Sequence, residues 1–253
     1  MKEEKSEETK SKGKYEVKCF ETEKDKVDES KIPHACKVGI FPKKLEQLGM
    51  LIVGRTGSGK TNVLLEILTN PDLLGDAFEK KNIFLYSALK PDPKMVETIK
   101  IPKKNIIKDW DEKVVQSQLD RLEQKAKKDF KSAPYTLLIF DDILQKKKFL
   151  KSATMSNLAT CHRHFKCCYA ILTQYYKAVS PVVRTNCSYI IFFASSQMES
   201  QKLYEEQAPN GYNKKKFLKC VDLATNEQYS FLSINTRAKY DEKLRKGFNL
   251  IMK

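Results

Sequence analysis

The chain has 253 residues, of which 41% are hydrophobic, and its formal net charge is +15. This length is enough for one α/β domain with a sizeable core. The sequence has no N-terminal apolar signal and no run of about 18 apolar residues, so we expect neither secretion nor a membrane span. The charge favours polyanionic partners, nucleic acid first. Seven cysteines without a C-x-x-C pair indicate reduced thiols.

Residues 1–31 are mainly Lys, Glu, Asp and Ser and bury too little apolar surface to offset chain entropy, so we predict a mobile charged tail. A folded domain over 32–253 follows. In it, apolar runs alternate with helical spacing, which predicts a mostly parallel sheet flanked by helices. The predicted strands are 50–53, 82–87, 135–140, 168–173 and 188–193. The first predicted helix follows the loop after the first strand and ends at about residue 68. Further helices are predicted over 111–131, 152–165 and 198–207. A C-terminal β-hairpin is predicted over 217–223 and 228–234.

Residues 54–61 read G-x-x-x-x-G-K-T, the phosphate-binding P-loop. An apolar run precedes this loop and a helical pattern follows it, so a bound phosphate would lie at a helix N-terminus. The glycines let successive N–H groups face the phosphate, Lys60 adds a charge at the β- and γ-phosphates, and the Thr61 hydroxyl can join the Mg²⁺ shell. The motif predicts binding of ATP and Mg²⁺, the nucleotide being held by Gly54, Arg55, Thr56, Gly57, Ser58, Gly59, Lys60 and Thr61.

The predicted strand 135–140 ends in two acids, Asp141 and Asp142. After a P-loop, an acid in the first position holds Mg²⁺ through its hydration shell, so Asp141 is the second predicted metal residue. An acid in the next position polarises the attacking water, which favours nucleotide hydrolysis over transfer to a small acceptor. Asp142 is one methylene shorter than the more usual Glu, so it would act through a longer hydrogen bond or a shifted strand.

The predicted strand 168–173 is followed by Gln174. A polar side chain at the carboxyl edge of a strand beside the phosphate site can reach the γ-phosphate or its water. We therefore predict that Gln174 senses the γ-phosphate; the alternative is an ordinary strand cap.

The order of these motifs, together with Arg163-His164-Phe165 and the later segment 183–192, resembles the HerA/FtsK superfamily of DNA-pumping P-loop ATPases. Within that superfamily, residues 45–235 are most similar to the poxvirus-type genome-packaging ATPases of large DNA viruses and virophages. The most diagnostic part is Thr173-Gln174 followed by Val183-Arg184-Thr185-Asn186.

This resemblance implies an ATP-driven motor that threads double-stranded DNA into a preformed capsid without reading its sequence. It also implies a homo-oligomeric ring, docking on a capsid protein, and a location in the virus factory of the host cytoplasm or in the virion. In that superfamily an arginine of the neighbouring subunit completes hydrolysis by neutralising charge on the γ-phosphate. Arg163 and Arg184 both match this role, Arg184 from a rim position; the alternative for each is a surface or ion-paired arginine.

Two lysine clusters and one Cys/His run accompany these motifs. The cluster 146–148 with Lys151 is expected to contact DNA phosphates in the pore of a ring, whereas 214–216 is expected to be an exposed loop. The run 161–168 has zinc-type side chains, but its spacing does not suit a zinc site.

The predicted function is therefore ATP-driven DNA translocation, with Lys60, Asp141, Asp142, Gln174 and one trans arginine as the catalytic set. The alternative is a nucleotide-dependent switch or assembly factor with slow hydrolysis and no DNA pumping. A small-molecule kinase is disfavoured because no Arg-rich lid stands out. Conjugation or cell-division pumps are disfavoured because they carry membrane segments or extra domains.

Overall fold

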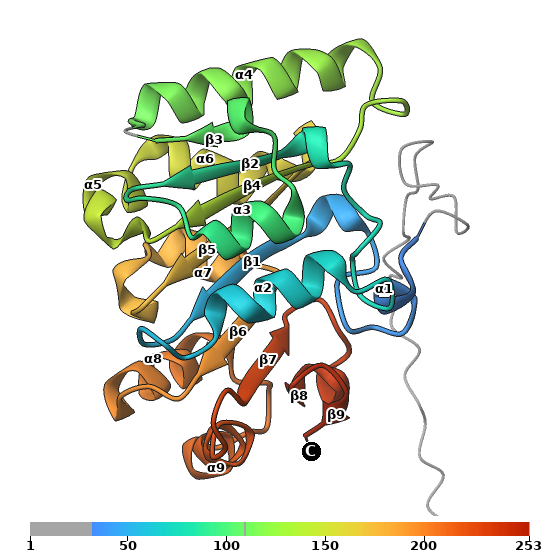
Figure 1. The fold of residues 1–253 in the computed structure, drawn as a ribbon. Helices are drawn as coiled ribbons and strands as arrows, with labels where there is room; N and C mark the ends of the chain where they lie inside the picture. The colour runs from blue at the N-terminus through green and yellow to red at the C-terminus, as the bar shows by residue number, and fades with distance from the viewer. Residues whose placement is uncertain (1–31, 109, 253) are drawn as a thin grey trace, which may run out of the picture.

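The computed structural model describes residues 32–108 and 110–252, so the predicted tail over 1–31 lies outside the described residues. Within them, one nine-stranded sheet has the order β3-β2-β4-β5-β1-β6-β7-β8-β9 (Figure 1). The strands from β3 to β6 are parallel, and β7, β8 and β9 continue the sheet as antiparallel neighbours. The strand bounds are β1 Gly49–Val53, β2 Ile83–Ser87, β3 Ile106–Ile107, β4 Thr136–Asp141, β5 Cys167–Thr173, β6 Tyr189–Phe193, β7 Phe231–Asn235, β8 Leu244–Lys246 and β9 Leu250–Ile251.

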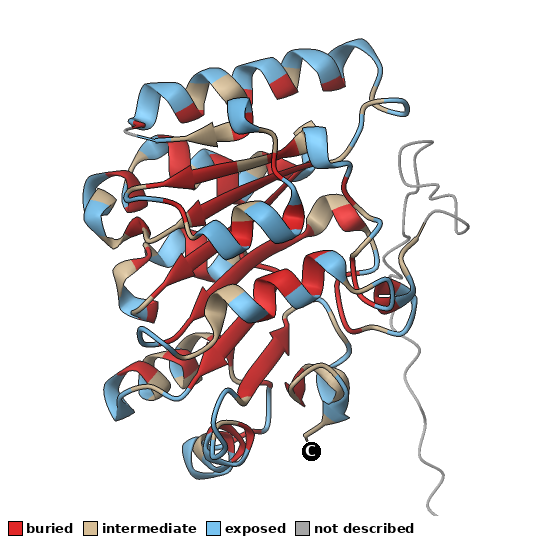
Figure 2. Cartoon of the chain, viewed as in Figure 1, coloured by how far each residue is buried: buried red, intermediate tan, exposed pale blue. Residues whose placement is uncertain are grey.

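Helices cover both faces of this sheet, which confirms the predicted α/β architecture (Figures 1 and 2). Side chains alternate along each strand, so Leu51 and Val53 join one core cluster while Met50 and Ile52 join the other. One face carries α1 His34–Lys37, α2 Lys60–Thr69 and α3 Pro93–Ile99. The other carries α4 Glu112–Lys128, α5 Lys147–Leu150, α6 Ala153–Cys161, α7 Pro181–Asn186, α8 Gln197–Gln207 and α9 Lys214–Ala224.

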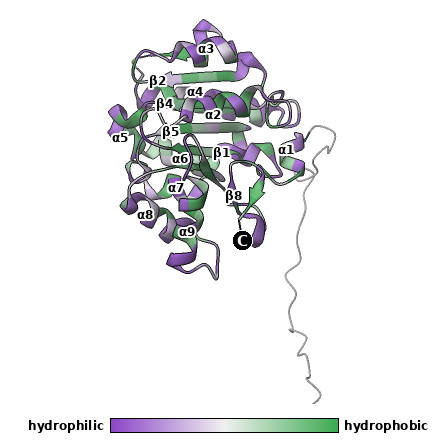
Figure 3. Ribbon diagram, turned by 60° about the horizontal axis from the view of Figure 1, so that its bottom comes forward, coloured by the Kyte–Doolittle hydropathy of each residue, from purple (hydrophilic) through white to green (hydrophobic). Residues whose placement is uncertain are grey.

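Six of the described helices begin at a residue whose side chain accepts a hydrogen bond from the first turn, namely α3, α4, α6, α7, α8 and α9. In α4 the buried residues Val115, Leu119, Leu122 and Ala126 recur at three- and four-residue intervals. The Asp111 carboxylate caps this helix by accepting from the Val114 N–H at 3.0 Å. Figure 3 shows the resulting contrast between the apolar strands and the outward, hydrophilic faces of the helices.

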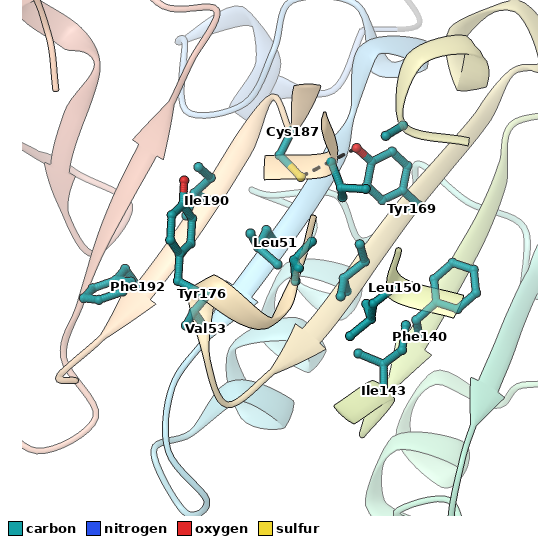
Figure 4. Packing of buried hydrophobic residues seen from close by; sticks show 14 of the residues in the cluster. Leu51, Val53, Phe140, Ile143, Leu150, Tyr169, Tyr176, Cys187, Ile190 and Phe192 are labelled. Atoms are coloured by element: carbon teal, nitrogen blue, oxygen red, sulfur yellow. Dashed lines mark hydrogen bonds between the residues drawn. The ribbon is translucent and has the colours of Figure 1, made fainter. Parts of the chain in front are cut away.

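The core on the face covered by α4 to α9 is largely apolar (Figure 4). Tyr169 is fully buried there, and its hydroxyl lies 3.6 Å from the Cys187 sulfur. Cys167 and Cys168 belong to opposite core clusters because adjacent strand residues point to opposite faces. The two thiols therefore cannot share one metal ion.

The structure corrects the predicted C-terminal hairpin. Residues 217–223 lie inside helix α9, not in a strand, because Phe217, Cys220, Val221 and Ala224 have helical spacing and Asn213 caps the helix. Only the second predicted arm is extended, as β7, and the antiparallel C-terminal region is formed by β7, β8 and β9. The predicted helix over 152–165 ends at Cys161, and residues 162–165 form a 3₁₀ turn.

Candidate nucleotide-binding site

The sheet order brings the predicted phosphate and magnesium residues together. Strand β5 pairs with β1 on one side and with β4 on the other. The P-loop after β1, Gln174 after β5 and Asp141 at the end of β4 therefore meet at one edge of the sheet. They line a cavity of about 290 Å³ to which Thr61 and Asp142 also contribute.

The P-loop backbone depends on its glycines. Gly57 and Gly59 have φ angles of 77° and 101°, in the left-handed region that favours glycine. A Cβ built on Gly54 would lie 2.4 Å from the Ser58 Oγ atom and 2.9 Å from the Phe193 Cβ atom, so a larger residue does not fit there. The Lys60 ammonium donates to the carbonyl oxygens of Gly54 at 2.8 Å and Arg55 at 3.0 Å. The loop thus folds around its own lysine at the start of α2.

Charge is concentrated in this cavity. Burial lowers the pKa of Lys60, and the nearby Asp141 and Asp142 oppose that shift. Burial raises the pKa of Asp141, and the charge of Asp142 raises it further. A divalent cation would oppose both causes that raise the pKa of Asp141. The residues present therefore fit Mg²⁺ held by Asp141 and the Thr61 hydroxyl.

Asp142 follows β4 with a φ of 51°, in the left-handed region. Asp and Asn tolerate this conformation better than most other residues. The backbone at this position thus gives a physical reason for an aspartate where a glutamate is more usual.

Three polar or charged residues of the cavity were not predicted, namely Ser87, Lys90 and Asp92. Ser87 ends β2 directly beside Asp141 in the β2–β4 register, is 1% exposed, and its Oγ atom has no hydrogen-bond partner among the described residues. Asp92 caps α3 by accepting from the Lys94 N–H at 2.9 Å and also lines the cavity. A polar residue closing an apolar strand was the available signal for Ser87, the same signal that marked Gln174.

The two candidate arginines lie away from this cavity. Arg184 is 4% exposed on α7 and forms an ion pair with Glu206, so its predicted rim position is wrong. Arg163 is exposed in the turn that precedes β5, at the amino edge of the strand, whereas the P-loop lies at the carboxyl edge. Arg163 therefore faces away from the nucleotide cavity of its own chain.

The lysine clusters differ in their settings. Lys146 lies in a 3₁₀ turn after Asp142, with its ammonium 5.5 Å from the centre of the Trp110 ring. Residues 214–216 form the first turn of α9 rather than a loop.

Among the described residues, no helix has the length and apolar composition that a membrane span requires.

This fold and this cavity define a P-loop NTPase domain in which β5 lies between the P-loop strand β1 and the strand β4 that ends in Asp141. Residues 43–237 match the poxvirus A32 protein family, and the chain belongs to that family. The resemblance inferred from the motifs is thereby confirmed.

Solved structures share the fold. The DNA-packaging ATPase B204 of Sulfolobus turreted icosahedral virus superposes with a TM-score of 0.54 at 15% identity, over 75% of this chain and 93% of that one. EssC (ATPases 2 and 3) of Geobacillus thermodenitrificans gives a TM-score of 0.54 at 13% identity, over 79% of this chain and 39% of that one.

Two viral proteins are similar in sequence. Protein 088R of Invertebrate iridescent virus 3 is 25% identical over 160 residues, which are 63% of this chain and 58% of that protein. Protein L437 of Acanthamoeba polyphaga mimivirus is 32% identical over 92 residues, 36% of this chain and 32% of that protein. The matches thus span less than two thirds of the length of either relative.

Proposed function

We propose that this protein is a Mg²⁺-dependent ATPase that drives double-stranded DNA into a viral capsid. The observation that carries the proposal is the convergence of Lys60, Thr61, Asp141, Asp142 and Gln174 on one cavity. Membership of the poxvirus A32 family and the fold shared with B204, a DNA-packaging ATPase, support the packaging role.

Each residue has a separate task in hydrolysis. The P-loop N–H groups and Lys60 hold the phosphates. Asp141 and Thr61 would hold Mg²⁺, which would supply positive charge against the charge that develops on the phosphates. Asp142 accepts the proton of the attacking water, and Gln174 orients that water or the γ-phosphate. Catalysis then consists of positioning and electrostatic stabilisation, as in other phosphoryl transfers.

A basic groove beside α4 supports the DNA partner. This groove measures about 600 Å³ and lies between α4 and the segments that lead into β2, β3 and β4. No described acidic residue lines it, and its cations form no ion pair with a described residue, apart from Lys81, which pairs with Glu79. Its other cations are Lys104, Arg121, Lys125 and Lys128. Such a surface binds phosphates without reading bases.

The decisive experiment is Mg²⁺-dependent ATP hydrolysis with and without long double-stranded DNA, for the wild type beside Lys60→Ala. Hydrolysis that DNA stimulates and the variant loses supports the motor. Hydrolysis that is slow and indifferent to DNA supports the switch or assembly factor instead.

A double variant Arg121→Ala/Lys125→Ala tests the groove, with Lys214→Ala/Lys215→Ala as the control. Each lost phosphate contact should reduce the salt slope of DNA binding by about 1.

Arg163 is the proposed trans arginine, in a homo-oligomeric ring that docks on a capsid protein in the virus factory or the virion. It is exposed and lies at the opposite edge of the sheet from the P-loop, so it can serve only the site of another copy. Arg163→Ala and Lys60→Ala subunits should each be inactive alone and regain partial activity when mixed. The trans assignment fails if mixing restores nothing although the subunits co-assemble.

A further inference from the structure

The direction of the bound triphosphate follows from the sheet order. The residues for the γ-phosphate, Asp141 and Gln174, lie at the ends of β4 and β5, on one side of the P-loop strand. Strand β6 pairs with β1 on the other side. A nucleotide whose γ-phosphate points toward Asp141 therefore extends its nucleoside toward β6 and β7.

Tyr229 occupies that side of the P-loop. It lies in the loop between α9 and β7, and β7 begins where β6 ends because Phe193 pairs with Phe231. A Cβ built on Gly59 would lie 3.4 Å from the Tyr229 Cδ1 atom and 3.7 Å from the Phe193 ring. Tyr229 thus lies beside the last glycine of the P-loop, yet the residue is 59% exposed.

The backbone holds this tyrosine in an unfavourable conformation. Its φ is 65°, in the left-handed region that a bulky aromatic residue rarely adopts. The loop around it is fastened at both ends: the Ser230 N–H and Oγ–H donate to the Glu227 carbonyl oxygen at 3.1 Å and 2.7 Å, and the Lys246 ammonium lies 2.6 Å from the Glu227 carboxylate. Strain of this kind collects at ligand sites, where the surrounding structure fixes a side chain in advance.

We propose that Tyr229 is the stacking platform for the base of the bound nucleotide, with a purine nucleoside triphosphate as the ligand. The inference rests on the proposed nucleotide binding and adds the base subsite to it. A ring whose backbone is already held in place needs little further ordering of the main chain when a base stacks on it, and a purine offers more area than a pyrimidine. Stacking reads no base edge, so ATP and GTP should bind with similar affinities.

The test separates the base from the phosphates. Calorimetry measures the binding of ATP and of inorganic tripolyphosphate, each with Mg²⁺, to the wild type, Tyr229→Ala, Tyr229→Phe and the control Tyr240→Ala. Tyr240 is 50% exposed and begins a 3₁₀ turn over 240–242, and its ring centre lies 6.3 Å from that of Tyr212. Tyr229→Ala should weaken ATP binding roughly 5- to 150-fold and leave tripolyphosphate binding unchanged. Tyr229→Phe and Tyr240→Ala should keep wild-type affinity for both.

Two results would overturn the inference while leaving the proposed function in place. Unchanged ATP affinity in Tyr229→Ala would show that the ring carries no base. An equal loss for ATP and tripolyphosphate would show that Tyr229 only supports the P-loop through Gly59. Failure of the wild type to bind either ligand would instead overturn the proposed nucleotide binding, and the inference with it.

Discussion

The guanidinium of Arg184 grips both carboxylate oxygens of Glu206, with Nε 2.7 Å from Oε2 and Nη2 2.6 Å from Oε1. The two side chains are only 5% and 12% exposed, and the Tyr176 hydroxyl donates to the same carboxylate at 2.9 Å. Burial opposes ionisation of Glu206, but the hydrogen bonds from Arg184 and Tyr176 outweigh it and lower its pKa. The pair fastens α7 to α8 inside one chain.

Replacing Arg184 should therefore cost stability first. Arg184→Ala leaves the Glu206 carboxylate buried without its partner, and such a loss typically costs about 3–5 kcal/mol. Urea unfolding of the variant measures this loss of stability. Glu205→Gln, at an exposed residue next to Glu206 on α8, is the control and should change stability by less than about 0.5 kcal/mol. An Arg184→Ala protein of wild-type stability whose hydrolysis is restored by mixed subunits would contradict this structural role.

The sequence was sufficient for the phosphate site because its signals are local. The P-loop needs eight consecutive residues, and the strands before Gly54 and Asp141 are continuous apolar runs that the parallel sheet buries on both faces. These features do not depend on distant partners. The predicted elements around Lys60, Asp141 and Gln174 were correspondingly accurate.

Long-range contacts, and the secondary structure of short apolar runs, could not be predicted from the sequence. The partner of Arg184 comes from a helix 22 residues further on, and no pattern near either residue announces the pair. The segment 217–223 was assigned to a strand because a short apolar run suits both strand and helix, and only packing against the core decides between them. The left-handed backbone of Asp142 and Tyr229 likewise has no local sequence signature here.

Ser87 should affect activity without supporting the fold. Its buried Oγ atom bonds to no described group, so Ser87→Ala removes no native hydrogen bond and should leave the free energy of unfolding unchanged or slightly raised. The hydroxyl lies beside Asp141, where it can orient the Mg²⁺ shell, and loss of such a group typically lowers metal affinity or activity 10- to 100-fold. Mg²⁺ titration of ATP hydrolysis measures this loss.

Ser188→Ala is the matched control for Ser87. The Ser188 hydroxyl is fully buried and accepts from the Gly49 N–H at 3.0 Å, away from the cavity. This variant should lose about 1–3 kcal/mol of stability and keep its Mg²⁺ dependence. The opposite pattern in the two serines would refute the assignment.

Asp142 should separate hydrolysis from binding. Asp142→Asn retains a residue that tolerates the left-handed φ but cannot accept the water proton, so hydrolysis should fall about 10²- to 10⁴-fold while ATP affinity is retained. Asp142→Glu keeps the carboxylate but places a less tolerant residue at φ 51°, which should cost about 1 kcal/mol of stability. Single-turnover kinetics and unfolding measure the two effects. Wild-type hydrolysis by Asp142→Asn would exclude Asp142 as the base.

His162 should make the fold sensitive to mild acid. The side chain is buried, its Nδ1–H donates to the Cys167 carbonyl oxygen at 2.8 Å, and its ring packs edge-on against Tyr169. Burial lowers the pKa of His162 from 6.5 to about 4. Between these values the unfolded chain binds a proton that the native state does not, so stability is full above pH 6.5 and falls as the pH drops toward 4.

From pH 7 to pH 5 this single group should remove roughly 2 kcal/mol of stability. Urea unfolding at both pH values tests it by comparing the wild type with His162→Asn, whose side-chain amide can still donate a hydrogen bond but does not titrate. The difference in stability between the two proteins should shrink by that amount at pH 5. Only the wild type has a histidine at this position that is protonated in the unfolded chain and neutral in the folded one. His164→Asn, at an exposed histidine two residues on, should leave the pH dependence unchanged. Parallel pH dependences for the wild type and His162→Asn would mean that water or structural relaxation lets the buried ring take up its proton without unfolding.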